Sequence, residues 1–257
     1  MVWSTLADPV TALLWTWALL VARIAPLVIM VPAFGGLRLV ASVRGGVILA
    51  LSVALWPVTL VSMPSAIAER VHMFGSQLAV GLLAGSAVLV LAESARTFGG
   101  LADTALGRGS MGPGDPLTNG PSSAFSSFFA LAWTALFVSS GAHLALLAGA
   151  HASLTTLPLG TIIGAGALAS QTMLVVDCLV AAFELAVALA LPAFAVSWIV
   201  DLILGWLNRA FPSLPAMFLA MPIRAVLGWL VVAMMLGPIV IATTELVSVV
   251  LPRLWGP

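Results

Sequence analysis

The run from Ser170 to Val200, SQTMLVVDCLVAAFELAVALALPAFAVSWIV, decides the class of fold. It is almost entirely apolar, and Asp177 and Glu184 are its only charged residues. About 20 such residues in a helix are enough to span the ~30 Å hydrocarbon core of a bilayer. Transmembrane β-barrels show short segments of alternating hydrophobicity instead, so this continuous Leu-, Ala- and Val-rich run predicts a membrane helix.

The same pattern recurs along the whole chain. Six apolar runs predict an all-α, polytopic membrane protein of about six hydrophobic helices. Several runs contain a proline, which removes a helical hydrogen bond and predicts a kink. The runs are Val10–Pro32, Gly45–Met63, Gln77–Ala95, Phe125–Ala148, Ser170–Val200 and Ala225–Val250. The prolines are Pro26, Pro32, Pro57, Pro192 and Pro238.

The composition excludes several classes of protein. Of the 257 residues, 62% are hydrophobic and 7% are charged, whereas a soluble domain carries about 25% charged residues. A soluble enzyme and a disordered chain are therefore both disfavoured. The net charge is zero and no basic run is present, which argues against nucleic acid as a partner. A membrane protein, or a subunit buried in an apolar assembly, remains.

The arginines predict an orientation. If all six runs cross the bilayer, six arginines fall on one side and two on the other, so the positive-inside rule places the first side in the cytoplasm. The first six are Arg38, Arg44, Arg96, Arg108, Arg209 and Arg224, and the other two are Arg70 and Arg253. No basic segment precedes the first run, which is therefore interpreted as a retained helix rather than a signal peptide.

Two polar breaks interrupt the apolar runs. Residues Arg96–Ser123 are dense in Gly and Pro, which predicts a long loop, and loops of that length without regular structure are usually functional or disordered. Residues Asp201–Arg224 contain Asn208 and three prolines, which predict a compact hairpin tip between the last two helices.

No catalytic or metal-binding pattern stands out, and we expect neither enzymatic activity nor a cofactor. His143 and His151 are eight residues apart, and no carboxylate lies near them in sequence to complete a metal site. Cys178 is alone, so a disulfide within the chain is impossible.

Four charged residues lie inside the apolar runs, namely Arg23, Glu93, Asp177 and Glu184. Each costs at least ~2.5 kcal/mol at mid-bilayer on insertion scales. They are expected either to make buried polar contacts with neighbouring helices or to face a polar lumen. Asp177 and Glu184 are seven residues apart and share a helix face, so a proton relay in a secondary transporter is an alternative hypothesis.

Short motifs follow one another along nearly the whole chain. The N-terminal motifs are Arg23-Ile-Ala-Pro26, Pro32-Ala-Phe34-Gly35, Val43-Arg44-Gly45, Pro57, Gln77–Gly81, Gly85, Gly99–Asp103, Gly107 and Asp115-Pro116. The later motifs are Gly141-Ala142-His143, Ser153, Leu157–Gly160, Pro192, Asp201–Gly205, Asn208–Pro212 and Met221–Arg224. Their order and spacing resemble the FliR/SctT family, the export-apparatus membrane proteins of bacterial flagella and type III secretion injectisomes.

The resemblance implies a subunit of a helical, hetero-oligomeric export gate that conducts unfolded secretion substrates across the bacterial inner membrane. Residues 1–165 would be the FliP/SctR-like part and residues 166–257 the FliQ/SctS-like hairpin. The implied partners are FliP/SctR-like and FliQ/SctS-like subunits, a large FlhA/SctV-like export-gate protein, a FlhB/SctU-like subunit, the secreted proteins and membrane lipid.

The resemblance also implies a pore plug at about residues 105–121. A closed gate needs bulky apolar groups and a backbone that can move aside, and here Met111 and Leu117 supply the only large apolar side chains after Leu106. The implied plug residues are Gly107, Arg108, Met111, Gly112, Asp115, Pro116 and Leu117. The implied cytoplasmic tip carries Asp201, Arg209 and Arg224. Relatives often have Glu where this chain has Gln77.

Overall fold

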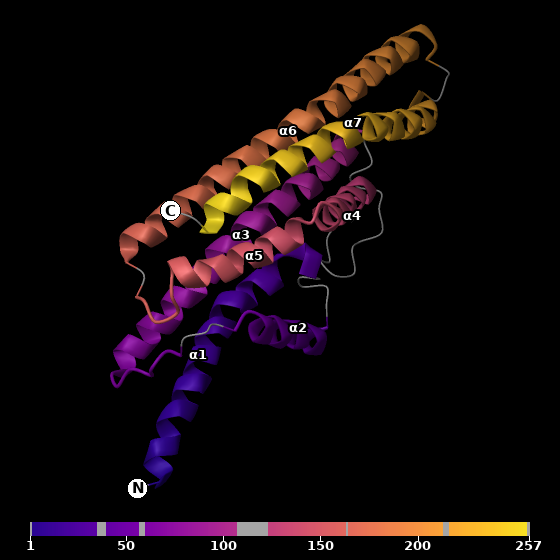
Figure 1. The fold of residues 1–257 in the computed structure, drawn as a ribbon. Helices are drawn as coiled ribbons and strands as arrows, with labels where there is room; N and C mark the ends of the chain where they lie inside the picture. The colour runs from indigo at the N-terminus through magenta and orange to yellow at the C-terminus, as the bar shows by residue number, and fades with distance from the viewer. Residues whose placement is uncertain are drawn as a thin grey trace. The chain divides into compact units, whose positions relative to one another are not determined.

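The regular structure is helical. The computed structural model of the protein describes residues 2–34, 40–56, 60–106, 123–162, 164–212 and 216–255. Within these residues the chain forms seven α-helices and one short 3-10 helix, and no strand (Figure 1). The all-α prediction is confirmed. The helices are α1 (Val2–Met30), η1 (Pro32–Phe34), α2 (Ala41–Ala54), α3 (Ile67–Ala105), α4 (Ala124–Ser139), α5 (Ala142–Thr156), α6 (Ala165–Ala210) and α7 (Ala216–Trp255).

The helices have the lengths and compositions of membrane spans. Four of them in the described part of the chain are long and apolar enough to cross a bilayer, and one bent pair raises the number to five. The prediction of a polytopic membrane protein is confirmed, whereas the expected number of about six differs. The four spans are Pro9–Met30, Ile67–Ala105, Leu168–Ala210 and Pro222–Ile241.

The expected run Gly45–Met63 contributes only the short helix α2, which has 14 residues. This helix ends shortly before Pro57, whose ring disfavours helical backbone in the residue ahead of it. Farther along, the backbone N–H of Val61 donates to Thr16 Oγ1 at 2.8 Å instead of to a helical carbonyl. Val61 therefore lies against α1, and α2 itself ends at Ala54.

The expected run Phe125–Ala148 is divided between α4 and α5, which are bent by 63° at a short break. Gly141 precedes α5 and has φ of 74°, in the left-handed region. Glycine reaches this region without the steric cost that a Cβ would bring. The glycine therefore permits the change of direction at which one expected helix becomes two.

Both polar breaks are shorter than expected. Helix α3 has 39 residues and continues past Arg96 to Ala105, although each helical glycine costs up to about 1 kcal/mol relative to alanine. At Gly99 the absence of a side chain permits close packing, because a Cβ there would lie 2.5 Å from the carbonyl oxygen of Phe125. At the expected tip, Asp201 and Arg224 both lie within helices, since α6 ends at Ala210 and α7 begins at Ala216.

The chain divides into two compact units. Unit 1 comprises Met1–Val90, Phe137–Leu179 and Leu246–Pro257. Its core is a cluster of apolar side chains from one face of α1, joined by one residue of α3 and one that follows α5. The buried members are Leu19, Leu20, Ile24, Val28, Met73 and Leu159.

Unit 2 comprises Leu91–Leu136 and Val180–Glu245. Aromatic rings make much of its core, with edge-to-face pairs between Phe98 and Phe129 at 4.5 Å and between Phe125 and Trp229 at 5.5 Å. Such pairs contribute about 0.5–1.5 kcal/mol beyond the area they bury.

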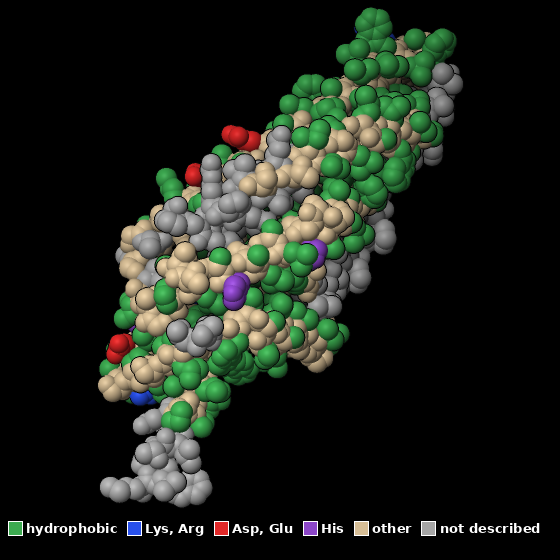
Figure 2. All heavy atoms as spheres, in the orientation of Figure 1, with side chains coloured by type: hydrophobic (Ala, Val, Ile, Leu, Met, Phe, Trp, Pro, Cys, Tyr) green, Lys and Arg blue, Asp and Glu red, His purple; other side chains and the backbone are tan. Residues whose placement is uncertain are grey.

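Within unit 2, α6 turns small side chains inward and large ones outward. The buried face carries Ala182, Ala186, Ala190 and Ala193, whereas Phe183, Leu191 and Trp198 are exposed. Hydrophobic side chains also cover much of the face shown in Figure 2. Small residues at the contact let membrane helices approach closely, and the large exposed ones are available to lipid or to other proteins.

Two glycines of α3 test the packing of unit 1. A Cβ on Gly81 would overlap the backbone carbonyl of Arg23 and lie 3.1 Å from its Cα, whereas a Cβ on Gly75 would meet nothing within 4 Å. We expect Gly81→Ala to lower the free energy of unfolding by about 1–3 kcal/mol. Gly75→Ala should raise it by about 0.5–1 kcal/mol, because alanine favours the helix. Unfolding of the purified protein in detergent measures both. Equal effects of the two changes would contradict the close contact at Gly81.

Candidate functional site

A buried arginine holds unit 1 together. Arg23 lies in α1 and is 2% exposed. Its Nε donates to Gln77 Oε1 at 2.8 Å, and its Nη2 donates to the same oxygen and to the Leu157 carbonyl, the latter at 2.7 Å. Its Nη1 donates to the carbonyl and the hydroxyl of Ser153, both at 3.3 Å. A guanidinium has five N–H donors, so each of them has an acceptor.

Gln77 completes this network. It is fully buried in α3, and its Nε2 donates to the Leu159 carbonyl at 3.1 Å. Arg23 and Gln77 together therefore connect α1, α3, α5 and the turn that follows α5. Every acceptor bonded to the guanidinium is neutral, so hydrogen bonds and not a counter-charge offset the cost of burying this cation among the described residues.

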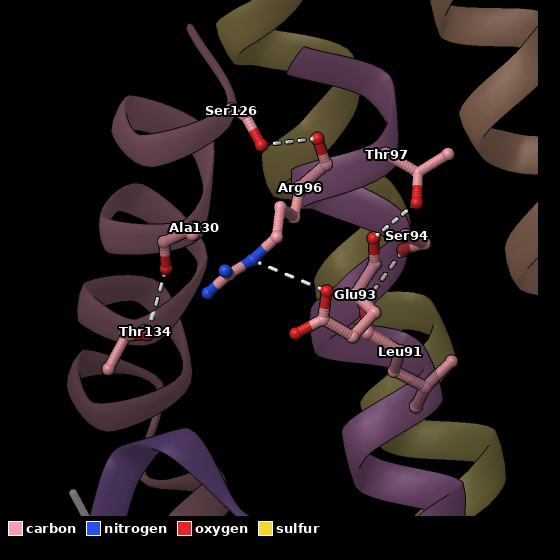
Figure 3. Close-up of polar contacts among 8 residues, drawn as sticks. All are labelled: Leu91, Glu93, Ser94, Arg96, Thr97, Ser126, Ala130 and Thr134. Carbon is pink, nitrogen blue, oxygen red and sulfur yellow. Dashed lines mark hydrogen bonds and ion pairs between the residues drawn. The ribbon is translucent and has the colours of Figure 1, made fainter. Parts of the chain in front are cut away.

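Glu93 and Arg96 form a second polar group, on α3 in unit 2 (Figure 3). Arg96 Nε lies 3.3 Å from Glu93 Oε2, and both side chains are partly exposed. An exposed pair of this kind contributes about 0–1 kcal/mol. The Ser126 hydroxyl of α4 donates to the Arg96 carbonyl at 2.9 Å, so a side-chain-to-backbone hydrogen bond joins the two helices here.

Asp103 links the end of α3 to the start of α4 within unit 2. It is 1% exposed, and its Oδ2 accepts hydrogen bonds from the Ser123 hydroxyl and from the Phe125 N–H, the latter at 2.8 Å. All seven implied plug residues fall between these two helices, in 107–122, outside the described residues.

The predicted tip residues have different surroundings. Arg224 of α7 forms an ion pair with Asp201 of α6, so these two predicted residues lie together. Arg209 is exposed near the end of α6, and it forms no ion pair among the described residues. The structure therefore leaves Arg209 as the tip cation that is accessible.

The remaining intramembrane acids, Asp177 and Glu184, are exposed in the isolated chain. Their expected burial would require a partner molecule, and it stays a prediction. Of the two histidines eight residues apart, His143 is half-buried and His151 is exposed. No group of three or more potential metal ligands occurs in the described segments.

Sequence reasoning missed the roles of Gln77, Ser153 and Asp103. Gln77 and Ser153 lie 54 and 130 residues from Arg23, so no local spacing connects them. Asp103 had a partial signal, because Ser123 stands immediately before an apolar run, as a helix N-cap does. That signal predicts the cap but not the aspartate that reaches it from α3.

Comparison with known proteins gives a consistent result. Residues 14–249 match the family model described as bacterial export proteins, family 1. The chain is also similar to the flagellar biosynthetic protein FliR of Caulobacter vibrioides, with 25% identity over 234 residues. The match covers 89% of this chain and 91% of that relative.

Substitution of Gln77 tests the buried network. Gln77→Leu would remove two acceptor contacts from a buried cation and should lower the free energy of unfolding by about 3 kcal/mol or more. Gln77→Glu would supply a carboxylate to the guanidinium and should retain most of the stability, less the lost bond to Leu159. Thermal unfolding in detergent measures both, with Gln171→Leu as the matched control. If Gln77→Leu costs no more than this control, the network does not hold the unit together.

Proposed function

The chain belongs to family 1 of the bacterial export proteins, and from this membership we propose that it is a subunit of a flagellar or type III export gate. It is a multi-pass protein of the bacterial inner membrane. In the gate it would help to form and close the channel through which unfolded secretion substrates pass. The similarity to a flagellar biosynthetic protein supports this role, and it does not favour the alternative of a proton-coupled transporter.

The length of the apolar surface on α6 carries the proposal. Exposed large apolar side chains occur along this helix from Met173 to Trp206, a span of about 50 Å at 1.5 Å per residue. The hydrocarbon core is about 30 Å thick. A straight helix would need a tilt of more than about 50° to bury this surface in lipid, whereas observed tilts reach about 40°.

Part of this surface therefore needs protein to cover it, as in a subunit of a larger assembly. The proposed neighbours are FliP/SctR-like and FliQ/SctS-like subunits, with a FlhB/SctU-like subunit and a large FlhA/SctV-like protein. We assign residues 166–257 to the FliQ/SctS-like hairpin and residues 1–165 to the FliP/SctR-like part. The positions of the two long helices support this division, because α6 starts at Ala165 and α7 follows it.

Segment 105–121 is the proposed plug of the pore. Its support is the family resemblance and its position in the chain between α3 and α4. At the cytoplasmic tip, Arg209 is the proposed contact for the large export-gate protein, because it is exposed whereas Arg224 is already paired with Asp201.

Co-expression tests the assembly. The tagged full chain should co-purify with FliP/SctR-like and FliQ/SctS-like subunits from the same bacterium. Arg209→Glu should leave that complex intact and reduce recovery of the large export-gate protein, because it reverses an accessible charge. Arg209→Lys is the matched control. Purification of the chain without either kind of subunit would contradict the proposed function, and equal recovery with Arg209→Glu would contradict the tip contact.

Deletion of Gly109–Gly114 tests the plug. The shortened chain should assemble with its partners and make the closed channel permeable to ions, because the barrier has lost part of its backbone and Met111. Ionic conductance of the purified complex in planar bilayers measures the change. Conductance at the level of the intact complex would show that the plug lies elsewhere.

A further inference from the structure

One exposed face of α6 has the spacing of a coiled-coil seam. Exposed side chains follow one another along it at alternating intervals of four and three residues. Side chains with this spacing are the ones that interdigitate with a second helix in a coiled coil. We call this face the α6 seam, and it consists of Met173, Asp177, Val180, Glu184, Val187 and Leu191.

The α6 seam contains two carboxylates and otherwise only apolar side chains. Asp177 and Glu184 are seven residues apart, about 10 Å along the helix at 1.5 Å per residue, and both are exposed. Among the described residues, neither carboxylate forms an ion pair or a side-chain hydrogen bond. The described part of the chain therefore leaves both negative charges without compensation.

Neither lipid nor water suits the whole seam. Hydrocarbon suits the four apolar side chains, but it makes each ionised carboxylate costly. Water suits the carboxylates, but it leaves an apolar face uncovered along about 27 Å of helix. A second helix satisfies both kinds of side chain if it brings apolar residues and places a cation against each carboxylate.

A second copy of this chain does not meet that requirement. Two copies in one membrane share an orientation, so their α6 helices would run parallel. In a symmetric parallel pair the same seam positions face each other. Asp177 and Glu184 would then each lie against their own counterpart, and like charges in such a contact are unfavourable. The charges of the seam therefore favour a helix from a different protein.

We propose that the α6 seam binds a membrane helix of a neighbouring protein that carries two basic side chains, Lys or Arg, about seven residues apart. These cations pair with Asp177 and Glu184. The two ion pairs fix the register of the helices, because a shift of one turn would leave charges unpaired in an apolar contact. The identity of the neighbour as an export-gate subunit rests on the proposed function.

Photo-crosslinking in the assembled complex identifies the neighbouring helix. A photoreactive amino acid replaces Val180 or Val187 in the tagged full chain, which is co-expressed with FliP/SctR-like and FliQ/SctS-like subunits. Mass spectrometry then locates the crosslinked peptide. We expect a helix of one of these subunits with a Lys or Arg within one turn of the crosslinked position. A helix without a basic residue there, or crosslinks to lipid alone, would overturn the proposal.

Charge reversal tests the ion pairs. Glu184→Arg places two cations against each other, so recovery of the crosslinked subunit with the tagged chain should fall about tenfold or more. Glu184→Gln removes one ion pair without adding repulsion and should lower the recovery less. Glu69→Arg is the matched control, because Glu69 is an exposed carboxylate at the start of α3, outside the seam. Changing the neighbour's basic residue to Glu should restore the recovery with Glu184→Arg, which a misfolded chain would not allow.

The outcomes separate this inference from the proposed function. If the unaltered chain forms the complex and Glu184→Arg recovers the subunit as well as Glu69→Arg does, the seam is not the contact and the proposed function stands. Loss of recovery with Glu184→Arg that the reversed neighbour does not restore would contradict the ion pair alone. If the unaltered chain recovers neither kind of subunit, the proposed function fails and the seam has no export-gate neighbour.

Discussion

A guanidinium placed among apolar helices must find its hydrogen-bond acceptors in the protein, because bulk water cannot reach it there. Arg23 meets this requirement through Gln77, Ser153 and the Leu157 carbonyl. The acceptors come from α3, α5 and the turn after α5. These elements are therefore restricted to positions in which the N–H groups of the guanidinium have acceptors. The close approach of α1 to α3 at Gly81 belongs to the same arrangement. The architecture of unit 1 depends on this one cation.

The identity of the acceptor has a physical meaning. The residue that accepts from Arg23 on α3 is an amide, Gln77, and not a glutamate. A neutral amide offers the guanidinium less electrostatic compensation than a carboxylate would, but its N–H also reaches the Leu159 carbonyl. The amide thus extends the hydrogen-bond network by one more segment, the turn that carries Leu159.

Unit 2 uses a buried group of the opposite charge for a related purpose. Asp103 accepts from the first turn of α4, while small residues such as Gly99 and Gly228 bring the helices together around it. The polar contacts determine which helix ends meet, and the small side chains determine how closely the helices approach each other. Large apolar residues of α6, such as Phe183, Leu191 and Trp198, are exposed, where lipid or other proteins would cover them.

The sequence by itself determined the all-helical membrane class, because long apolar runs with few charges allow little else in a bilayer. It also singled out Arg23 as a costly charge and the motifs that relate the chain to export proteins. Helix ends such as Ala54 and Ala105, and the partners of Arg23 and Asp103, were decided only by the tertiary structure. These contacts join residues 20 to 134 positions apart, and no local propensity or period records a pairing that exists only when helices pack.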